Sequence, residues 1–146
     1  MDSVFEIHVE GIDQLERLAT TLEEGFDFER MLDEGAALLF NRIRTRYIQA
    51  VDPDENPWAV SKAAQIRADK GIGGLTGYDS GTLFHSLQLF KSNELERTIG
   101  TDVPYAPFFQ FGARGQPERI FLAASDDDVL MLENLFIQRI SEVLNG

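Results

Sequence analysis

The sequence predicts an α+β domain, in which an antiparallel sheet of about four or five strands carries a long helix and a C-terminal helix on one face. Three observations lead to this prediction. Apolar and polar residues alternate near the N-terminus, as in a half-buried strand. Two long segments, near residues 27–51 and 125–143, carry apolar residues at helical spacing. Between them lie short apolar runs bounded by turn residues, which is typical of strands.

Length and composition indicate one globular domain over residues 1–146. The chain has 43% hydrophobic and 26% charged residues and shows no linker or internal repeat. It has no cysteine, which excludes disulfides and thiolate metal sites and fits folding in a reducing cytoplasm. The apolar runs are far shorter than the roughly 20 residues that span a bilayer, and the N-terminus lacks a signal-peptide pattern.

The charge balance argues against tight binding to nucleic acid. The chain has 25 acids and 13 bases, a net charge of −12, whereas phosphate binding needs a positive surface. Arg42, Arg44 and Arg46 leave a small basic patch as an alternative. An acidic surface past which DNA slides without sticking agrees with the composition.

The first elements are a strand and a helix. Phe5, Ile7 and Val9 alternate with polar residues, and Gly11 ends the pattern. Residues 12–24 then carry apolar side chains at helical spacing after a capping Asp13, so we expect a helix there.

A second, longer helix is predicted from Asp27, which can cap its first turn. Asp52 and Pro53 are expected to end it, because the residue before a proline is pushed out of the helical region. Gly35 and the two alanines after it would let another element approach closely.

The middle of the chain contains a short polar helix and a glycine-rich loop. The helix is expected over residues 61–70. Residues 71–81 contain five glycines in eleven residues, so they predict a loop that is mobile in the free subunit and ordered against a partner.

The last third alternates strand and turn signals before a final helix. Residues 82–87 are expected to lead into a strand pair, with a turn at 92–94 and a returning strand at 95–101. Residues 105–111 are dense in aromatic side chains, and 119–122 read as a last strand. Ser125 with Asp128 predicts a capping box, followed by an apolar stripe at Val129, Leu132, Phe136, Ile140 and Val143.

Catalytic, nucleotide and metal sites are poorly supported. His85 and Ser86, with Asp79 nearby, offer a hydrolase alternative, but no nucleophile-elbow motif is present. The glycine-rich loop lacks the Lys-Ser/Thr ending of a phosphate loop. The acids at 126–128 are better explained by the helix dipole than by a metal.

Three ordered segments carry a family resemblance. The first contains Asp52, Pro53 and Trp58, and the second Gly81, Leu83 and Ser86; the third contains Gly100, Tyr105, Ala106, Gln110, Gly112, Arg119 and Phe121. Their order and spacing resemble the tailed-phage virion morphogenesis family, also described as tail-completion or head–tail joining (neck) proteins, over roughly residues 30 to 144. The chain departs from the family pattern at Phe109, where His is frequent, and at residues 55–56, where Gly is common.

The resemblance implies a structural protein without enzymatic activity, metal or cofactor. It implies a ring at the phage neck between the portal-side connector and the tail tube, with a hexamer favoured over a dodecamer. The implied partners are a head-completion or connector protein and a tail terminator or tail tube protein, and DNA passes through without specific binding. The chain is then expected in the virion after synthesis in the host cytoplasm.

The glycine-rich loop and the aromatic segment are the expected contact surfaces. Read as a strand with two faces, residues 105–111 are expected to turn alternate aromatic side chains to the core as a wall. The others would face out and pack against a neighbouring subunit, because aromatic side chains are enriched in interface cores. The candidate interface residues are Trp58, Gly73, Gly74, Leu75, Tyr78, Tyr105, Phe108, Phe109, Phe111 and Arg114. A monomeric binding adaptor and a small hydrolase remain the alternatives.

Overall fold

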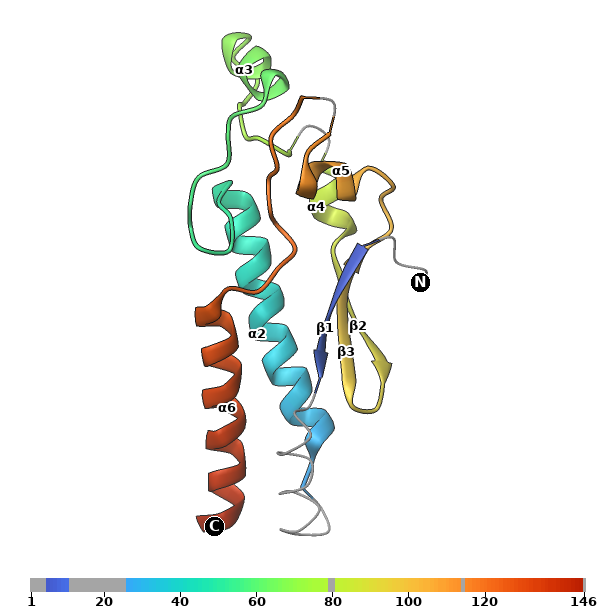
Figure 1. Cartoon of the computed structure of the whole chain (residues 1–146), viewed down its shortest axis with the longest axis vertical. Coiled ribbons are helices and arrows are strands. Elements are labelled where there is room, and N and C mark those ends of the chain that lie inside the picture. Colours follow the sequence, from blue (N-terminus) through green and yellow to red (C-terminus); the bar gives the residue numbers. More distant parts are fainter. Residues whose placement is uncertain (1–4, 11–25, 79–80, 114, 146) are drawn as a thin grey trace.

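A three-stranded antiparallel sheet with a long helix packed on it forms the centre of the molecule (Figure 1). The computed structural model describes residues 5–10, 26–78, 81–113 and 115–145. The strands are β1 (Phe5–Glu10), β2 (Gln88–Asn93) and β3 (Glu96–Thr101), in the order β1-β3-β2. The helices of the described part are α2 (Phe28–Gln49), α3 (Lys62–Asp69), α4 (Thr82–Ser86), α5 (Ala106–Phe111) and α6 (Asp126–Asn145).

Strand β1 confirms the alternation seen in the sequence. Val9 is buried, Phe5 and Ile7 are half-buried, and the polar residues between them are exposed. The strand pairs with β3 in a regular antiparallel register that places Phe5 opposite Thr101. The helix expected over residues 12–24 lies outside the described residues.

Helix α2 is the long helix expected from the Asp27 cap, whose carboxylate accepts a hydrogen bond from the Arg30 N–H at 3.0 Å. It ends at Gln49, before Asp52 and Pro53. The reason is that Ala50 adopts a left-handed conformation, with φ of 56°, and turns its N–H back to the last carbonyls of the helix. Its apolar face packs on all three strands.

Helix α6 packs against α2, so α2 lies between α6 and the sheet (Figure 1). Gly35 permits this contact, because a Cβ atom there would lie 3.0 Å from both Leu132 and Phe136. The expected capping box is confirmed at the start of α6. Ser125 N–H donates to Asp128 Oδ2 at 2.9 Å, and Asp128 N–H donates to Ser125 Oγ at 3.1 Å.

Two expected strands are helices instead. Residues 82–86 form α4, which begins at Gly81 and buries Leu83 and Phe84 together. Residues 106–111 form α5. A short apolar run fits the periodicity of a helix as well as that of a strand, so tertiary packing decides between the two in such segments.

The prediction of a strand over residues 119–122 is also wrong, because this segment pairs with no strand of the described sheet. Its backbone bonds instead to a side chain: the N–H groups of Phe121 and Leu122 both donate to Gln110 Oε1 at 3.0 Å. The described sheet therefore has three strands rather than four or five.

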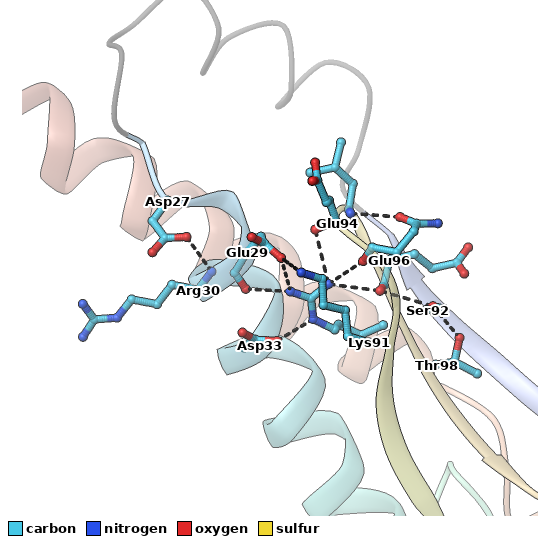
Figure 2. A network of polar contacts seen from close by, with 12 residues as sticks. Asp27, Glu29, Arg30, Asp33, Lys91, Ser92, Glu94, Glu96 and Thr98 are labelled. Atoms are coloured by element: carbon cyan, nitrogen blue, oxygen red, sulfur yellow. Dashed lines mark hydrogen bonds and ion pairs between the residues drawn. The ribbon is translucent and has the colours of Figure 1, made fainter. Parts of the chain in front are cut away.

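A buried guanidinium fastens the β2–β3 hairpin to the first turns of α2. Arg97, on β3, is only 2% exposed and donates to the carbonyl oxygens of Asn93 at 2.9 Å and Glu96 at 3.0 Å. It also pairs with Asp33 and Glu29 of α2. Figure 2 shows these two acids of α2 facing the hairpin, where Glu29 also meets Lys91.

Candidate functional site

The short helices α3, α4 and α5 gather at the end of the molecule away from the C-terminus (Figure 1). Most of the interface residues predicted from the sequence lie here. The helices and the loops between them decide which of those side chains reach the surface.

Helix α5 divides the aromatic residues into two groups. Tyr105, Phe108 and Phe111 are 48%, 63% and 63% exposed, and they share one side at a spacing of three residues. We call these three residues the aromatic surface. Ala106 and Gln110, on the other side of the helix, are buried. The two-sided arrangement expected from the sequence exists, on a helix instead of a strand.

Phe109 belongs to the core of the subunit. Its ring lies 5.3 Å from that of Trp58 and 5.6 Å from that of Phe121, and it stacks on Tyr47 at 6.1 Å. Trp58 is 7% exposed and donates its Nε1–H to the Ile120 carbonyl at 3.0 Å. These two side chains support the aromatic surface from beneath and are not part of it.

Gln110 holds α5 in place by its side-chain amide. Besides the two N–H groups that its Oε1 accepts, its Nε2 donates to the Leu122 carbonyl at 3.0 Å. The side chain is buried and all of its hydrogen bonds go to the segment after α5. Sequence periodicity gave no sign of this role, because a lone glutamine in an aromatic run resembles a surface residue.

Beside the aromatic surface lies a cleft of about 230 Å³, between α3, the start of α4 and α5. Tyr78, Tyr105 and Phe109 all line it. Arg119 borders the cleft as well, with its Nε donating to the Ala59 carbonyl at 2.9 Å and its guanidinium 5.8 Å from the Phe109 ring centre. The structure therefore brings together residues that the sequence placed in separate segments.

The glycine-rich loop is folded back on its own subunit. The Tyr47 hydroxyl donates to the Gly77 carbonyl at 2.6 Å, and the Ser61 N–H donates to Thr76 Oγ1 at 3.2 Å. Burial, with a further effect of Tyr105, raises the pKa of Tyr47, so the hydroxyl keeps its proton as a donor. Thr76 and Gly77 are therefore anchored within the chain, while the mobility of the loop and its ordering against a partner stay predictions. Gly73 and Gly74 are exposed at the tip, Leu75 is half-buried, and Arg114 lies outside the described residues.

His85 and Ser86 do not meet. His85 Nε2 lies 3.0 Å from the Tyr78 hydroxyl, while Ser86 Oγ donates to the Leu83 carbonyl at 2.6 Å and lies 2.6 Å from Thr101 Oγ1. Ser86 is engaged in holding the end of α4 to β3. Among the described residues the geometry gives no support to the hydrolase alternative, and its Asp79 lies outside the described residues.

The basic patch on α2, left open as an alternative by the sequence, is not supported, because its three arginines have partners within the chain. Arg42 and Arg46 both pair with Asp128, at 3.0 and 2.8 Å. The Arg44 guanidinium lies over the rings of Phe40 and Phe84, at 5.5 and 5.2 Å. We therefore do not expect these arginines to be available for DNA or for a neighbouring subunit.

The described residues offer neither a metal site nor a membrane-spanning helix. Within the described ranges, no cluster of three or more His, Asp and Glu side chains is placed to hold a metal ion. None of the described helices combines the length and hydropathy needed to cross a membrane.

The fold is that of a small α+β domain that exposes three aromatic side chains along α5. A comparison with protein families matches residues 9–141 to the phage virion morphogenesis family, and the chain belongs to this family. The family confirms the resemblance seen in the sequence and gives the chain a structural or assembly role in a phage virion. No curated protein and no solved structure matches the chain.

Proposed function

We propose that this protein is a non-enzymatic neck subunit that completes the tail and joins it to the head. In this proposal several copies form a ring between the portal-side connector and the tail tube. A hexamer is favoured over a dodecamer. The neighbours along the particle axis are a head-completion or connector protein and a tail terminator or tail tube protein.

The aromatic surface is the observation that carries the proposal. Single exposed apolar residues are ordinary, but Tyr105, Phe108 and Phe111 are three large rings on one side of a short helix. Aromatic residues are enriched at the centres of protein interfaces. Their helix is held from beneath by Gln110 and Phe109, so it presents a fixed surface to a partner.

The charge of the chain fits a ring through which DNA passes. With a net charge of −12 and several of its arginines paired internally, the subunit offers little to hold phosphates. We propose that a neutral or acidic bore lets the genome slide. A bore lined mainly by Arg and Lys in an assembled particle would contradict this part of the proposal.

Removal of the gene from the phage tests the joining role. We expect filled heads and finished tails to accumulate separately in electron micrographs, and the wild-type chain supplied in trans to restore joined particles. A normal yield of infectious particles without the chain would overturn the proposal. A particle reconstruction with one copy at the junction would overturn the ring and favour a monomeric adaptor.

A further inference from the structure

Helix α3 carries a line of exposed residues in which two bases flank an apolar side chain. Lys62, Ile66 and Lys70 are spaced by four residues and so lie on one side of the helix. Ile66 is 53% exposed, and Val60 and Ile72 beside the helix are 61% and 67% exposed. Residues 60–72 hold three bases and one acid, in a chain with 25 acids and 13 bases. We call Lys62, Ile66 and Lys70 the α3 line.

The two lysines of this line have neither a carboxylate partner nor an aromatic ring against them in the described part of the chain, whereas Arg44 and Arg119, which also lack an ion pair, lie over aromatic rings. Neither one forms an ion pair with a described residue. By contrast, arginines on α2, β3 and α6 are paired with carboxylates, and Lys91 is paired with Glu29. Unpaired cations beside exposed apolar residues are suited to an acidic and apolar partner surface.

Helix α6 carries an exposed line of the opposite kind beside its buried stripe. Asp126, Leu130, Glu133 and Ile137 follow one another at steps of four, three and four residues, so they share one side of the helix. Leu130 and Ile137 are 54% and 56% exposed, and the two acids pair with no base among the described residues. We call these four residues the α6 line.

The α6 line borders the side of α6 that packs inward, and its Glu133 lines a hollow of about 250 Å³ that β1 also borders. The buried residues of that helix, Phe136 and Ile140, belong to the apolar stripe recognised in the sequence, and Leu130 and Ile137 do not. Arg139, a base on the same helix, faces Glu34 and Glu142 at 2.8 and 3.2 Å. The α6 line is thus apolar and acidic, and no described base neutralises its two carboxylates.

The two lines match in spacing as well as in charge. Lys62 and Lys70 are eight residues apart, or about 12 Å along a helix, and Asp126 and Glu133 are seven apart, or about 10 Å. Each charged pair encloses one exposed apolar residue, Ile66 in the first line and Leu130 in the second. When the two helices are aligned with Ile66 opposite Leu130, each lysine of the α3 line can therefore lie beside one carboxylate of the α6 line.

We propose that the α3 line of one copy docks on the α6 line of the next copy in the ring. Within one subunit α3 lies beyond the N-terminal end of α6 (Figure 1), so the two lines cannot contact each other in the same copy. Contact between two different surfaces is head-to-tail, the type that closes into a ring. The inference rests on the proposed ring and names the contact that would build it.

Cysteine cross-linking tests the contact directly, because the chain has no cysteine of its own. We expect the double variant Ile66→Cys with Leu130→Cys to give, on oxidation, a ladder of covalent multimers up to the size of the ring. The ladder is sought in the free protein and in purified particles, since some ring subunits assemble only on the particle. Each single variant, and the pair Ile66→Cys with the exposed Ile48→Cys on α2, should remain monomeric. Dimers from Ile66→Cys alone would indicate contact between two α3 helices and overturn the proposal.

Charge reversal tests the pairing by complementation. Lys62→Glu with Lys70→Glu, and separately Asp126→Lys with Glu133→Lys, should each lower the yield of rings by at least about tenfold. An equimolar mixture of the two variants should restore rings of alternating subunits, because each altered line then meets a complementary one. Gln65→Glu and Asp127→Lys are matched controls on exposed positions outside the lines, and they should assemble normally.

The results separate the contact from the ring itself. Rings that form normally from both reversed variants would overturn the α3–α6 contact and leave the ring standing. A wild-type chain present in one copy per particle would overturn the ring and the contact together.

Discussion

Arg46 Nη1 lies 2.8 Å from Asp128 Oδ2, and both side chains are buried. This pair joins α2 to the first turn of α6, across 82 positions of the sequence. The same guanidinium donates to the carbonyl oxygens of Pro53 at 3.4 Å and Ala123 at 3.3 Å. One arginine therefore fixes the turn after α2, the segment before α6, and the helix that carries the α6 line.

Removal of the Asp128 carboxylate should destabilise the fold strongly, because it leaves a buried guanidinium without its counter-charge. We expect Asp128→Ala to lower the free energy of unfolding by about 3–5 kcal/mol. The control is Asp127→Ala, at the exposed neighbouring position, which should change it by less than about 0.5 kcal/mol. Urea unfolding measures both. Equal losses in the two variants would show that the pair with Arg46 does not decide the stability.

The same carboxyl should make stability depend on acid pH. Burial alone would raise the pKa of Asp128, but hydrogen bonds from the Ser125 N–H, Arg46 and Arg42 outweigh burial and hold the pKa below its ordinary value of 3.8. A carboxyl with a lowered pKa in the folded state contributes stability above its unfolded pKa, and this is lost as the pH falls through the folded pKa. The difference in unfolding free energy between wild type and Asp128→Asn should thus be constant above about pH 5 and shrink below pH 4. A constant difference down to pH 2 would contradict the assigned shift.

Gly77 is predicted to tolerate no side chain. It has a φ of +80°, and a Cβ there would lie 2.8 Å from Phe109 Cζ and 2.9 Å from Tyr47 Oη. Gly71 has a similar φ of +73°, but no atom lies within 4 Å of such a Cβ. An alanine at position 71 therefore measures the cost of the left-handed backbone alone, without a steric clash. We expect Gly71→Ala to cost about 1 kcal/mol and Gly77→Ala about 2–4 kcal/mol in thermal or urea unfolding. Equal costs would mean that the contact with Tyr47 and Phe109 adjusts freely.

Features with a local cause were predictable from the sequence. The Asp27 cap, the Ser125–Asp128 capping box and the alternation of β1 each depend on residues a few positions apart. The pairing of Arg46 with Asp128 was not predictable. The sequence places three arginines close together on α2 but does not say which acid, so far along the chain, will neutralise them.

The candidate site was only partly predictable, because its geometry depends on whether residues 105–111 form a strand or a helix. A strand would place Tyr105, Phe109 and Phe111 on one face, whereas helix α5 places Tyr105, Phe108 and Phe111 outside and Phe109 inside. The choice is made by distant contacts, chiefly the bonds of Gln110 to the segment at 121–122. No periodicity within seven residues carries that information.

Alanine substitutions at Phe108 and Phe109 should have different effects, the first on assembly and the second on stability, although the two side chains are adjacent and chemically identical. Phe108 is 63% exposed, so Phe108→Ala should change the free energy of unfolding by less than about 0.5 kcal/mol. If the aromatic surface contacts a partner, the same variant should lower the yield of joined particles in a complementation assay, because a truncated central ring loses much of the binding energy of an interface. Phe109→Ala removes a ring packed between Tyr47, Trp58 and Phe121, so it should cost about 3 kcal/mol of stability. Joined particles at the wild-type level with Phe108→Ala, from a chain of unchanged stability, would remove α5 as the contact and leave the α3 and α6 lines as the remaining candidate surfaces.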